Sequence, residues 1–405
     1  MTIDKLNSKR YDYALDGLRG FAALSVAYAH VFGFRNLLDR SWHPNEYFAY
    51  LQPAHASVLI FFIISGYVIG LTTFDKSFSL NNTKQYLIRR FIRLVPIYWI
   101  AIVISFLALP VDNFSNILGN SLFLQILIFP TLQSNPILWT LNYEVIYYLL
   151  FLLIWWLKPS IKLIIGFCIS ISFLGWVLPN APQLLSSYAS GWIFWIFGLW
   201  LSQKKTWEYE IKRKIPVISY LCLLIASNHF ETGKVILYGL GFRNITAGAV
   251  NFSDIALLPI CLLIVGEVTN QKFRFYKLFQ FLSFIIPLSN IVLFLIIGRI
   301  FENGSWTTAT LLTLCSMIFW QVRNSTNLIA KLSLVGSISY AFYVLHMPIA
   351  YLVNRYTSYQ GTFTTFLTRL ILWFLITVMA AALLELVIQP YIKSRLNHLF
   401  VNVKN

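Results

Sequence analysis

The chain has 405 residues, of which 58% are hydrophobic, 17% aromatic and only 11% charged. This composition excludes an ordinary soluble multidomain protein and indicates a chain embedded in a lipid bilayer. The formal net charge of +16 does not indicate a nucleic-acid partner, because the basic residues recur in short clusters between apolar segments.

Twelve apolar segments are long enough to cross, or nearly cross, the roughly 30 Å hydrocarbon core of a bilayer. In chain order they cover residues 15–34, 54–74, 94–110, 138–157, 161–178, 187–202, 214–228, 252–268, 278–297, 306–321, 332–354 and 364–390. Because several are short, we expect about 10 to 12 transmembrane helices. The sequence therefore predicts an all-α, polytopic membrane helix bundle, in which one membrane domain fills residues 15–392.

The distribution of Lys and Arg predicts the orientation of this bundle. If both termini are cytoplasmic, 23 of the 31 basic residues fall in cytoplasmic segments. Residues 1–14 and 393–405 then form cytoplasmic tails. The polar first fifteen residues indicate no cleaved signal, so the first apolar segment is expected to act as the first span.

The four cysteines lie far apart, each in an apolar stretch, and show no spacing typical of metal ligands. We interpret them as core or lipid-facing residues and predict no metal site.

The first span carries three ionisable side chains, Asp16, Arg19 and His30, whose transfer into a bilayer costs free energy. Arg19 and His30 are eleven residues apart, so they share one helix face and lie roughly 16 Å apart along the axis. A polar stripe across the membrane is one interpretation. The structural alternative is that Asp16 and Arg19 lie at the membrane interface, either paired or snorkelling, and that His30 is a buried, hydrogen-bonded histidine near the outer face.

A basic cluster, formed by Arg89, Arg90 and Arg93, precedes the span predicted to begin near residue 94. Guanidinium groups bind phosphates in a bidentate fashion, so the cluster suits an anionic cofactor at the cytoplasmic surface. Such runs also anchor proteins to anionic lipid, which is the alternative.

Glu144 is a lone carboxylate in an apolar run, two residues after Asn142. In a span it needs a partner, and Arg19, His30 or Arg369 could supply one. The alternatives are a carboxylate that orients a catalytic histidine and a structural ion pair between helices.

Two further blocks contain polar residues within spans. Residues 338–349 hold Tyr340, Tyr343 and His346, and the histidine either serves a site or caps carbonyls freed by Pro348. Ser65 and Gly66 are small residues, which indicate a position of close helix packing.

Taken together and in this order, these motifs resemble the acyltransferase 3 family of bacterial membrane acyltransferases. The matching blocks are LDGLRGFAALSVAYAH, FFIISGYVIG, RRFIRLVPIYW, WTLNYEVIYYLLF and ISYAFYVLHMPI, and the resemblance runs from about residue 12 to residue 349. The resemblance implies an integral protein of the bacterial cytoplasmic (inner) membrane. It also implies acetyl-CoA, or another acyl-CoA, as the cytoplasmic donor and a hydroxyl of an envelope or exported carbohydrate as the acceptor.

The resemblance also implies roles for particular residues. His30 matches the family's essential first-span histidine, Arg19 its paired arginine and Glu144 its acidic residue. Arg89, Arg90 and Arg93 match the basic block implicated in CoA binding. We expect supporting or substrate-binding roles for Asp16, Ser65, Asn142, Tyr340 and His346.

We expect Glu144 to orient His30, which either removes the acceptor's proton or first accepts the acetyl group itself. Some family members carry an additional soluble esterase-like domain, whereas this chain ends at residue 405, so transfer is expected to need the membrane domain alone or a separate partner. Two other functions stay open: a transporter or flippase for a glycan or lipid-linked sugar, and a non-catalytic membrane scaffold.

Overall fold

The computed structural model describes residues 13–178, 180–203, 216–242, 248–271, 273–322 and 325–401, and these residues form helices and no β-strand. The first part of the chain forms α1 (Tyr13–Gly33), α2 (Ala54–Ile69), α3 (Leu80–Ala108), α4 (Phe114–Ser121), α5 (Trp139–Leu157), α6 (Ile161–Val177), α7 (Gln183–Ser202), α8 (Val217–His229) and α9 (Thr232–Gly239). The second part forms α10 (Leu258–Val268), α11 (Tyr276–Ile296), α12 (Gly304–Phe319), α13 (Ser325–Ala330), α14 (Ser333–Ser337), α15 (Ser339–Tyr356), α16 (Phe363–Ala382) and α17 (Gln389–Val401).

Shorter helical pieces join or extend several of these helices. The 3₁₀ pieces are Glu46–Tyr50, Pro136–Leu138 and Phe252–Leu257. The π-helical pieces, Gly70–Phe74 and Leu383–Ile388, continue α2 and α16. Each of the twelve predicted apolar segments overlaps a helix, so the prediction of an all-α fold is confirmed.

Six helical stretches of the described chain are long and apolar enough to cross a membrane, and α6, α8 and α12 are shorter apolar helices. The six are Glu46–Phe74, Leu80–Ala108, Pro136–Leu157, Gln183–Ser202, Tyr276–Ile296 and Phe363–Arg395. The count of ten to twelve spans and the side of each terminus stay predictions. Residues 1–12 and 204–215, which hold two of the predicted cytoplasmic basic clusters, lie outside the described residues, as does Arg243.

Helix α3 begins earlier than the sequence pattern predicted. Its first residue is Leu80, and the Oγ of Ser79 accepts a hydrogen bond from the backbone N–H of Asn82, which caps the helix. The arginine cluster therefore projects from an established helix. Apolar composition predicted only the more buried part of α3, because a helix that continues outside the apolar layer needs no hydrophobic run.

Helices α2 and α7 cross at very short distance. A Cβ atom on Gly66 would lie 1.9 Å from the carbonyl oxygen of Trp195, and one on Gly198 would lie 2.0 Å from that of Ile63. Only glycine at both positions permits this backbone approach. The prediction that Gly66 marks close helix packing is confirmed.

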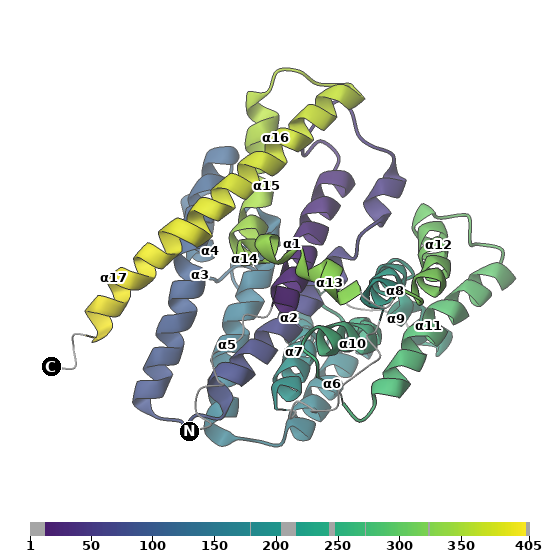
Figure 1. Ribbon diagram of the computed structural model, residues 1–405, viewed down its shortest axis with the longest axis horizontal. Helices are drawn as coiled ribbons and strands as arrows, with labels where there is room; N and C mark the ends of the chain where they lie inside the picture. Colours follow the sequence, from purple (N-terminus) through teal and green to yellow (C-terminus); the bar gives the residue numbers. More distant parts are fainter. Residues whose placement is uncertain are drawn as a thin grey trace, which may run out of the picture.

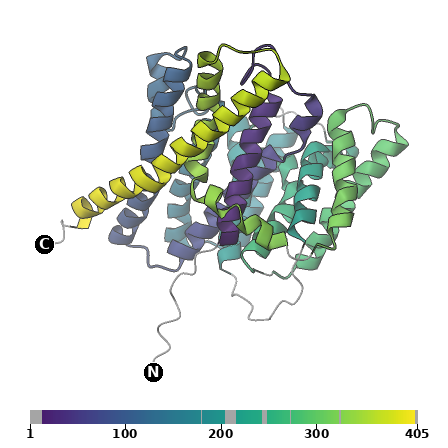
Figure 2. The same cartoon turned by 45° about the horizontal axis from the view of Figure 1, so that its top comes forward.

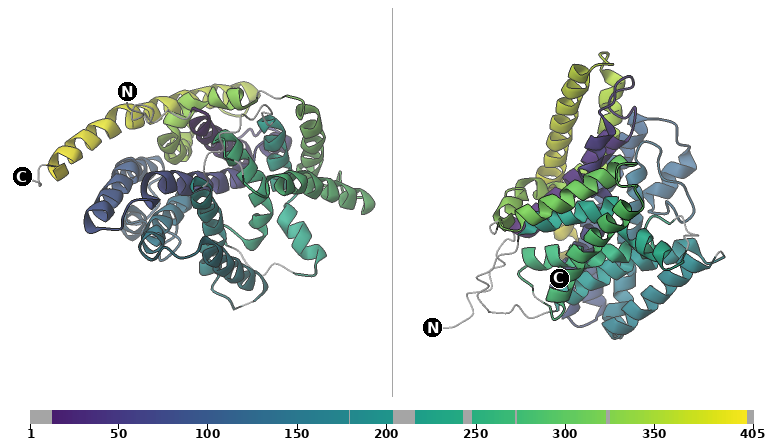
Figure 3. Two further views of the ribbon diagram at one scale, coloured as in Figure 1. Left: turned by 60° about the horizontal axis from the view of Figure 1, so that its bottom comes forward. Right: turned by 90° about the vertical axis from the view of Figure 1, so that its right-hand side faces the viewer.

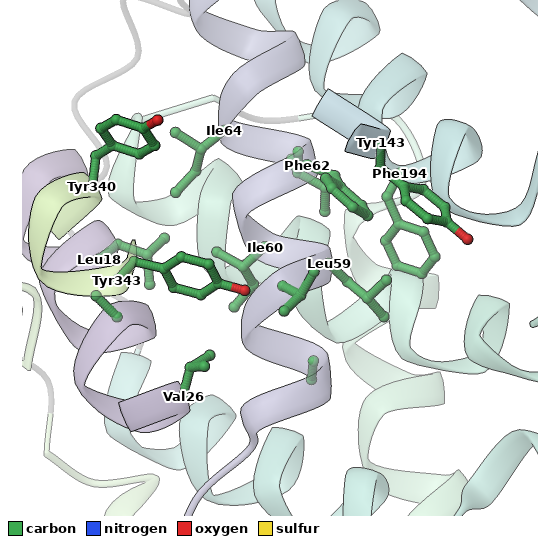
Figure 4. Close-up of a cluster of buried hydrophobic side chains, with 14 of the residues drawn as sticks. Leu18, Val26, Leu59, Ile60, Phe62, Ile64, Tyr143, Phe194, Tyr340 and Tyr343 are labelled. Carbon is green, nitrogen blue, oxygen red and sulfur yellow. The ribbon is translucent and has the colours of Figure 1, made fainter. Parts of the chain in front are cut away.

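The buried core surrounds α2. Figure 4 shows Tyr340 and Tyr343 of α15 on one side of this helix, and Phe62 together with Tyr143 and Phe194 on the other. These rings and the aliphatic side chains between them are buried. The core therefore fixes α15 and α5 relative to α2, and these three helices also carry much of the candidate site.

Helix α16, the π-helical piece and α17 form one continuous rod along the outside of the bundle, which ends far from α11 and α12 (Figure 1). Figure 2 shows the rod crossing in front of the other helices, and the left view of Figure 3 shows it along one edge of the molecule. The rod continues to Val401, past the position where the C-terminal tail was predicted to begin.

Candidate functional site

A cavity of about 730 Å³ lies between α1, α2, α3, α5, α15 and the start of α17. This volume falls within the range of about 300–1,000 Å³ that small-molecule sites occupy. Its polar lining includes Asp16, Arg19, Ser65, Arg89, Arg90, Arg93, Thr140, Glu144, Tyr148, Tyr340, Tyr343, Glu385 and Lys393. Side chains that are far apart in the sequence therefore meet at one site.

The cavity runs along α2, whose lining residues extend from Val58 to Val68, about 15 Å along the helix axis. Near Val68 the lining includes the arginines of α3 and Tyr148. Toward Val58 it includes Thr140 and Tyr343, which share a hydrogen bond of 3.0 Å between Oγ1 and the phenolic oxygen. The charged and the weakly polar parts of the lining are thus separated along α2.

Two arginines of α3 are held over aromatic rings. The guanidinium of Arg90 lies 5.7 Å from the ring centroid of Tyr86 and 5.6 Å from that of Tyr148. Its buried Nε has no hydrogen-bond partner among the described residues. Arg93 lies 5.5 Å from the ring centroid of Tyr340. Both guanidinium groups thus lie within cation–π distance of aromatic rings.

Arg19 and Asp16 form an ion pair with 2.7 Å between Nη1 and Oδ1, and both line the cavity. The side chains are 25% and 14% exposed, so the pair reaches the cavity and is not covered by packing. The structural alternative, in which these residues pair, is confirmed, and the pair also belongs to the site. Glycine contacts allow this arrangement, since a Cβ on Gly336 would lie 1.8 Å from the carbonyl oxygen of Asp16.

Glu144 is held by hydroxyl groups. Its Oε1 accepts a short hydrogen bond from Tyr148 and lies 3.5 Å from the Oγ of Ser65. Ser65 in turn accepts a hydrogen bond from the indole of Trp195 at 3.3 Å. In the described part of the chain, Glu144 bonds to hydroxyls and not to His30, so the expected orientation of His30 by Glu144 is wrong.

His30 bonds to His346, with 2.9 Å between Nδ1 of the first and Nε2 of the second. Neither histidine lines the cavity. Tyr343 connects the two places: it lines the cavity, and its ring centroid is 6.0 Å from that of His346. The histidine pair therefore lies directly beyond the weakly polar end of the cavity.

Two residues considered for the site lie outside it. Asn142 donates to the carbonyl of Phe123 at 2.6 Å and accepts from the hydroxyl of Tyr188, so it ties α5 to a loop and to α7. Arg369, considered as a partner for Glu144, lies 3.9 Å from Asp39. Both act in packing.

Tyr340 lines the cavity, and its hydroxyl donates to the carbonyl of Leu94 at 2.8 Å. It ties α15 to α3 at the position where Arg93 lies over its ring. Tyr340 thus lies at the cavity, and its supporting role stays a prediction.

The sequence interpretation missed Glu385. Its Oε2 lies 3.1 Å from Nη1 of Arg93, and its Oε1 accepts from the backbone N–H of Ala341 at 3.1 Å. Ala341 is in the first turn of α15, where amides lack helical partners, so Glu385 caps that helix. Glu385 is a lone carboxylate in a predicted span, the same signal that identified Glu144.

Five basic and three acidic side chains line the cavity, so its charge favours an anionic ligand. Among the described residues, no group of three or more His, Cys, Asp or Glu side chains is placed to hold a metal ion. The arrangement can bind a large anion at one end and offers a histidine pair beyond the other.

Comparison with known proteins identifies the family to which the chain belongs. The model of an acyltransferase domain, that of the acyltransferase 3 family, matches residues 12–386. A similar protein is the peptidoglycan O-acetyltransferase OatA of Listeria monocytogenes, 36% identical over 100 residues, which are 24% of this chain and 14% of that protein. The chain thus aligns with about one seventh of that relative's length. No solved structure gives a significant match. Together with the apolar helices, the family match fits an integral, multi-pass membrane protein, and the chain belongs to the acyltransferase 3 family.

Proposed function

We propose that this protein transfers an acetyl group from cytoplasmic acetyl-CoA to a hydroxyl of a cell-envelope or exported carbohydrate at the far side of the inner membrane. The observation that carries the proposal is the cavity with arginines at one end and the histidine pair beyond the other. Family membership supports the acyl transfer, and the similar peptidoglycan O-acetyltransferase supports a carbohydrate acceptor.

In this proposal the arginine end binds the phosphates of CoA. Arg89 is exposed, Arg90 lines the cavity beside it, and Arg93 already pairs with Glu385. Several guanidinium groups spaced along one helix suit the separated phosphates of CoA better than a single headgroup. A lipid anchor would need no cavity behind the cluster.

The pantetheine arm then extends along α2 and brings the thioester toward Thr140 and Tyr343. The length of the lined part of α2, about 15 Å, suits an extended chain that ends near the histidine pair. In this proposal Arg19, which lines the cavity beside Asp16, steadies the pantetheine or thioester region. Glu144 lines the cavity and is held there by the hydroxyls of Tyr148 and Ser65. In this proposal it does not orient His30.

His30 is proposed to be the catalytic residue. It either removes the proton of the acceptor hydroxyl, or accepts the acetyl group from the thioester and passes it to the acceptor. In both routes the thioester must pass Tyr343, so side-chain movement at the Thr140–Tyr343 hydrogen bond is required.

The experiment uses membrane vesicles that contain the full chain and acetyl-CoA labelled in the acetyl group. We expect label in vesicle carbohydrate when acetyl-CoA is given on the side that is cytoplasmic in the cell. Arg93→Ala should raise the KM for acetyl-CoA, whereas Arg299→Ala, an exposed residue paired with Glu302, should not. Transport of an unlabelled glycan without acetylation would instead support the transporter.

A further inference from the structure

The contact between His30 and His346 joins residues 316 positions apart. The rings are nearly parallel, with an interplanar angle of 10° and 5.2 Å between centroids. Nδ1 of His30 and Nε2 of His346 are the facing atoms, 2.9 Å apart. One of these two nitrogens must therefore carry the hydrogen.

The second nitrogen of His346 decides which one. Its Nδ1 lies 2.6 Å from the backbone oxygen of Tyr343. A carbonyl oxygen can only accept, so Nδ1 carries a hydrogen and donates it. His346 is fully buried, and its ring partners in the described part of the chain are the backbone of Tyr343 and Phe342 and the ring of His30. A buried imidazole without a carboxylate partner is neutral, because an unpaired buried charge is costly.

A neutral His346 with its hydrogen on Nδ1 has a lone pair on Nε2, which accepts from His30. We propose that His346 is a positioning residue that fixes the proton of His30 on Nδ1 and leaves the lone pair of His30 on Nε2. Nε2 is then the reactive atom of His30. Such control of a histidine tautomer by the bond to its other nitrogen is a general device at catalytic sites.

The backbone around His346 is held on both sides. The indole of Trp373 donates to the carbonyl of His346 at 2.8 Å. Pro348 has no N–H for the carbonyl of Val344, and the amide of Asn135 donates to that carbonyl at 2.9 Å. The carbonyl of Val344 is thus satisfied by Asn135, whereas His346 donates to the carbonyl of Tyr343.

This inference rests on the proposed function and adds the atom at which it acts. In the direct route, Nε2 of His30 takes the proton of the acceptor hydroxyl while the acceptor oxygen bonds to the acetyl carbon. The bond between that carbon and sulfur breaks, and the thiolate takes the proton from Nε2. The products are the acetyl ester and CoA as a thiol.

The direct test is the tautomer, read by nitrogen-15 NMR of the full chain labelled at its six histidines in lipid. The signals of His30 are those that vanish in His30→Ala. We expect its hydrogen on Nδ1 in the wild type and in His346→Gln, whose amide oxygen can still accept. His346→Met should give a mixture of tautomers. A hydrogen on Nε2 in the wild type would overturn the proposal.

The kinetic test uses the same variants. His346→Met should lower kcat by about five- to tenfold, because only part of the population then carries the correct tautomer, with the KM for acetyl-CoA unchanged. His346→Gln should recover most of this loss. Wild-type kcat in His346→Met, or a raised KM with unchanged kcat, would show a merely structural residue. If the wild type transfers no acetyl group at all, the proposed function fails, whereas the NMR result still decides the tautomer.

Discussion

Arg93 and Glu385, which are 292 positions apart in the chain, form an ion pair at the cavity, with 3.1 Å between Nη1 and Oε2. The carboxylate is 2% exposed and the guanidinium 41% exposed. Glu385 thus occupies part of the donor set of Arg93 and lowers the positive charge available to an anionic ligand.

We expect Glu385→Gln to lower the KM for acetyl-CoA by about three- to tenfold, which corresponds to roughly 1 kcal/mol of removed charge repulsion. The amide oxygen of glutamine can still accept from Ala341, so the cap of α15 remains. Steady-state kinetics in vesicles measure the effect. Glu302→Gln, an exposed partner of Arg299, is the matched control and should change nothing. A higher KM in Glu385→Gln would contradict the assignment of this end to CoA.

Replacement of Arg90 by lysine separates charge from planar geometry. Lysine keeps the charge but lacks the planar guanidinium that lies beside the rings of Tyr86 and Tyr148. We therefore expect the KM for acetyl-CoA to rise about three- to tenfold, with little change in kcat. Arg299→Lys is the control. A loss of kcat at unchanged KM would argue that Arg90 acts on the chemical step.

The crossing of α2 and α7 predicts a large loss of stability in Gly198→Ala. The added methyl group would lie 2.0 Å from the carbonyl oxygen of Ile63, so the helices must separate, at a cost of about 1–3 kcal/mol or more. Gly166→Ala is the matched control, because nothing lies within 4 Å of its Cβ position. Equal thermal unfolding temperatures of the two variants would contradict the close crossing.

Asp39 lies in the loop after α1 and is buried. Burial acts to raise the pKa of its carboxyl group, but hydrogen bonds from the backbone of Ser41, Gly361 and Trp42 lower it, and the net pKa lies below the usual value. The hydroxyl of Thr365 also donates to it, at 3.2 Å. Asp39 therefore ties this loop to the start of α16.

Because the folded-state pKa of Asp39 lies below the unfolded value of about 3.9, the carboxylate stabilises the fold above that value. This contribution is lost as the pH falls through the folded-state pKa. We expect the unfolding temperature of the wild type to fall more steeply below about pH 4 than that of Asp39→Asn. Parallel acid profiles of the two proteins would contradict this role.

Several features could be predicted from the sequence because they depend on local composition. Apolar runs indicated helices at all twelve positions, and the small residues at Gly66 marked a real crossing. Lone polar side chains in apolar runs identified Arg19 and Glu144 at the cavity, and the same criterion applied to residue 385 would have added Glu385.

Pairing between distant segments could not be predicted in the same way. From the sequence, His30 could have bonded to a carboxylate or to another histidine. Its bond to His346 results from the packing of α1 against α15. The burial of Arg369 beside Asp39 likewise depends on contact between two residues that are 330 positions apart in the chain. The start of α3 was missed because capping by Ser79, and not hydrophobicity, sets it.

The most direct measurement of the central claim is mass spectrometry of envelope and secreted carbohydrates from cells that express the wild type or His30→Ala. His55→Ala, whose imidazole pairs with Asp254 away from the cavity, is the control for loss of a histidine. We predict that the wild type and His55→Ala add the mass of one acetyl group to a carbohydrate and that His30→Ala, present in the membrane at equal amount, does not. Equal acetylation in His30→Ala would contradict the claim that this histidine carries the transfer.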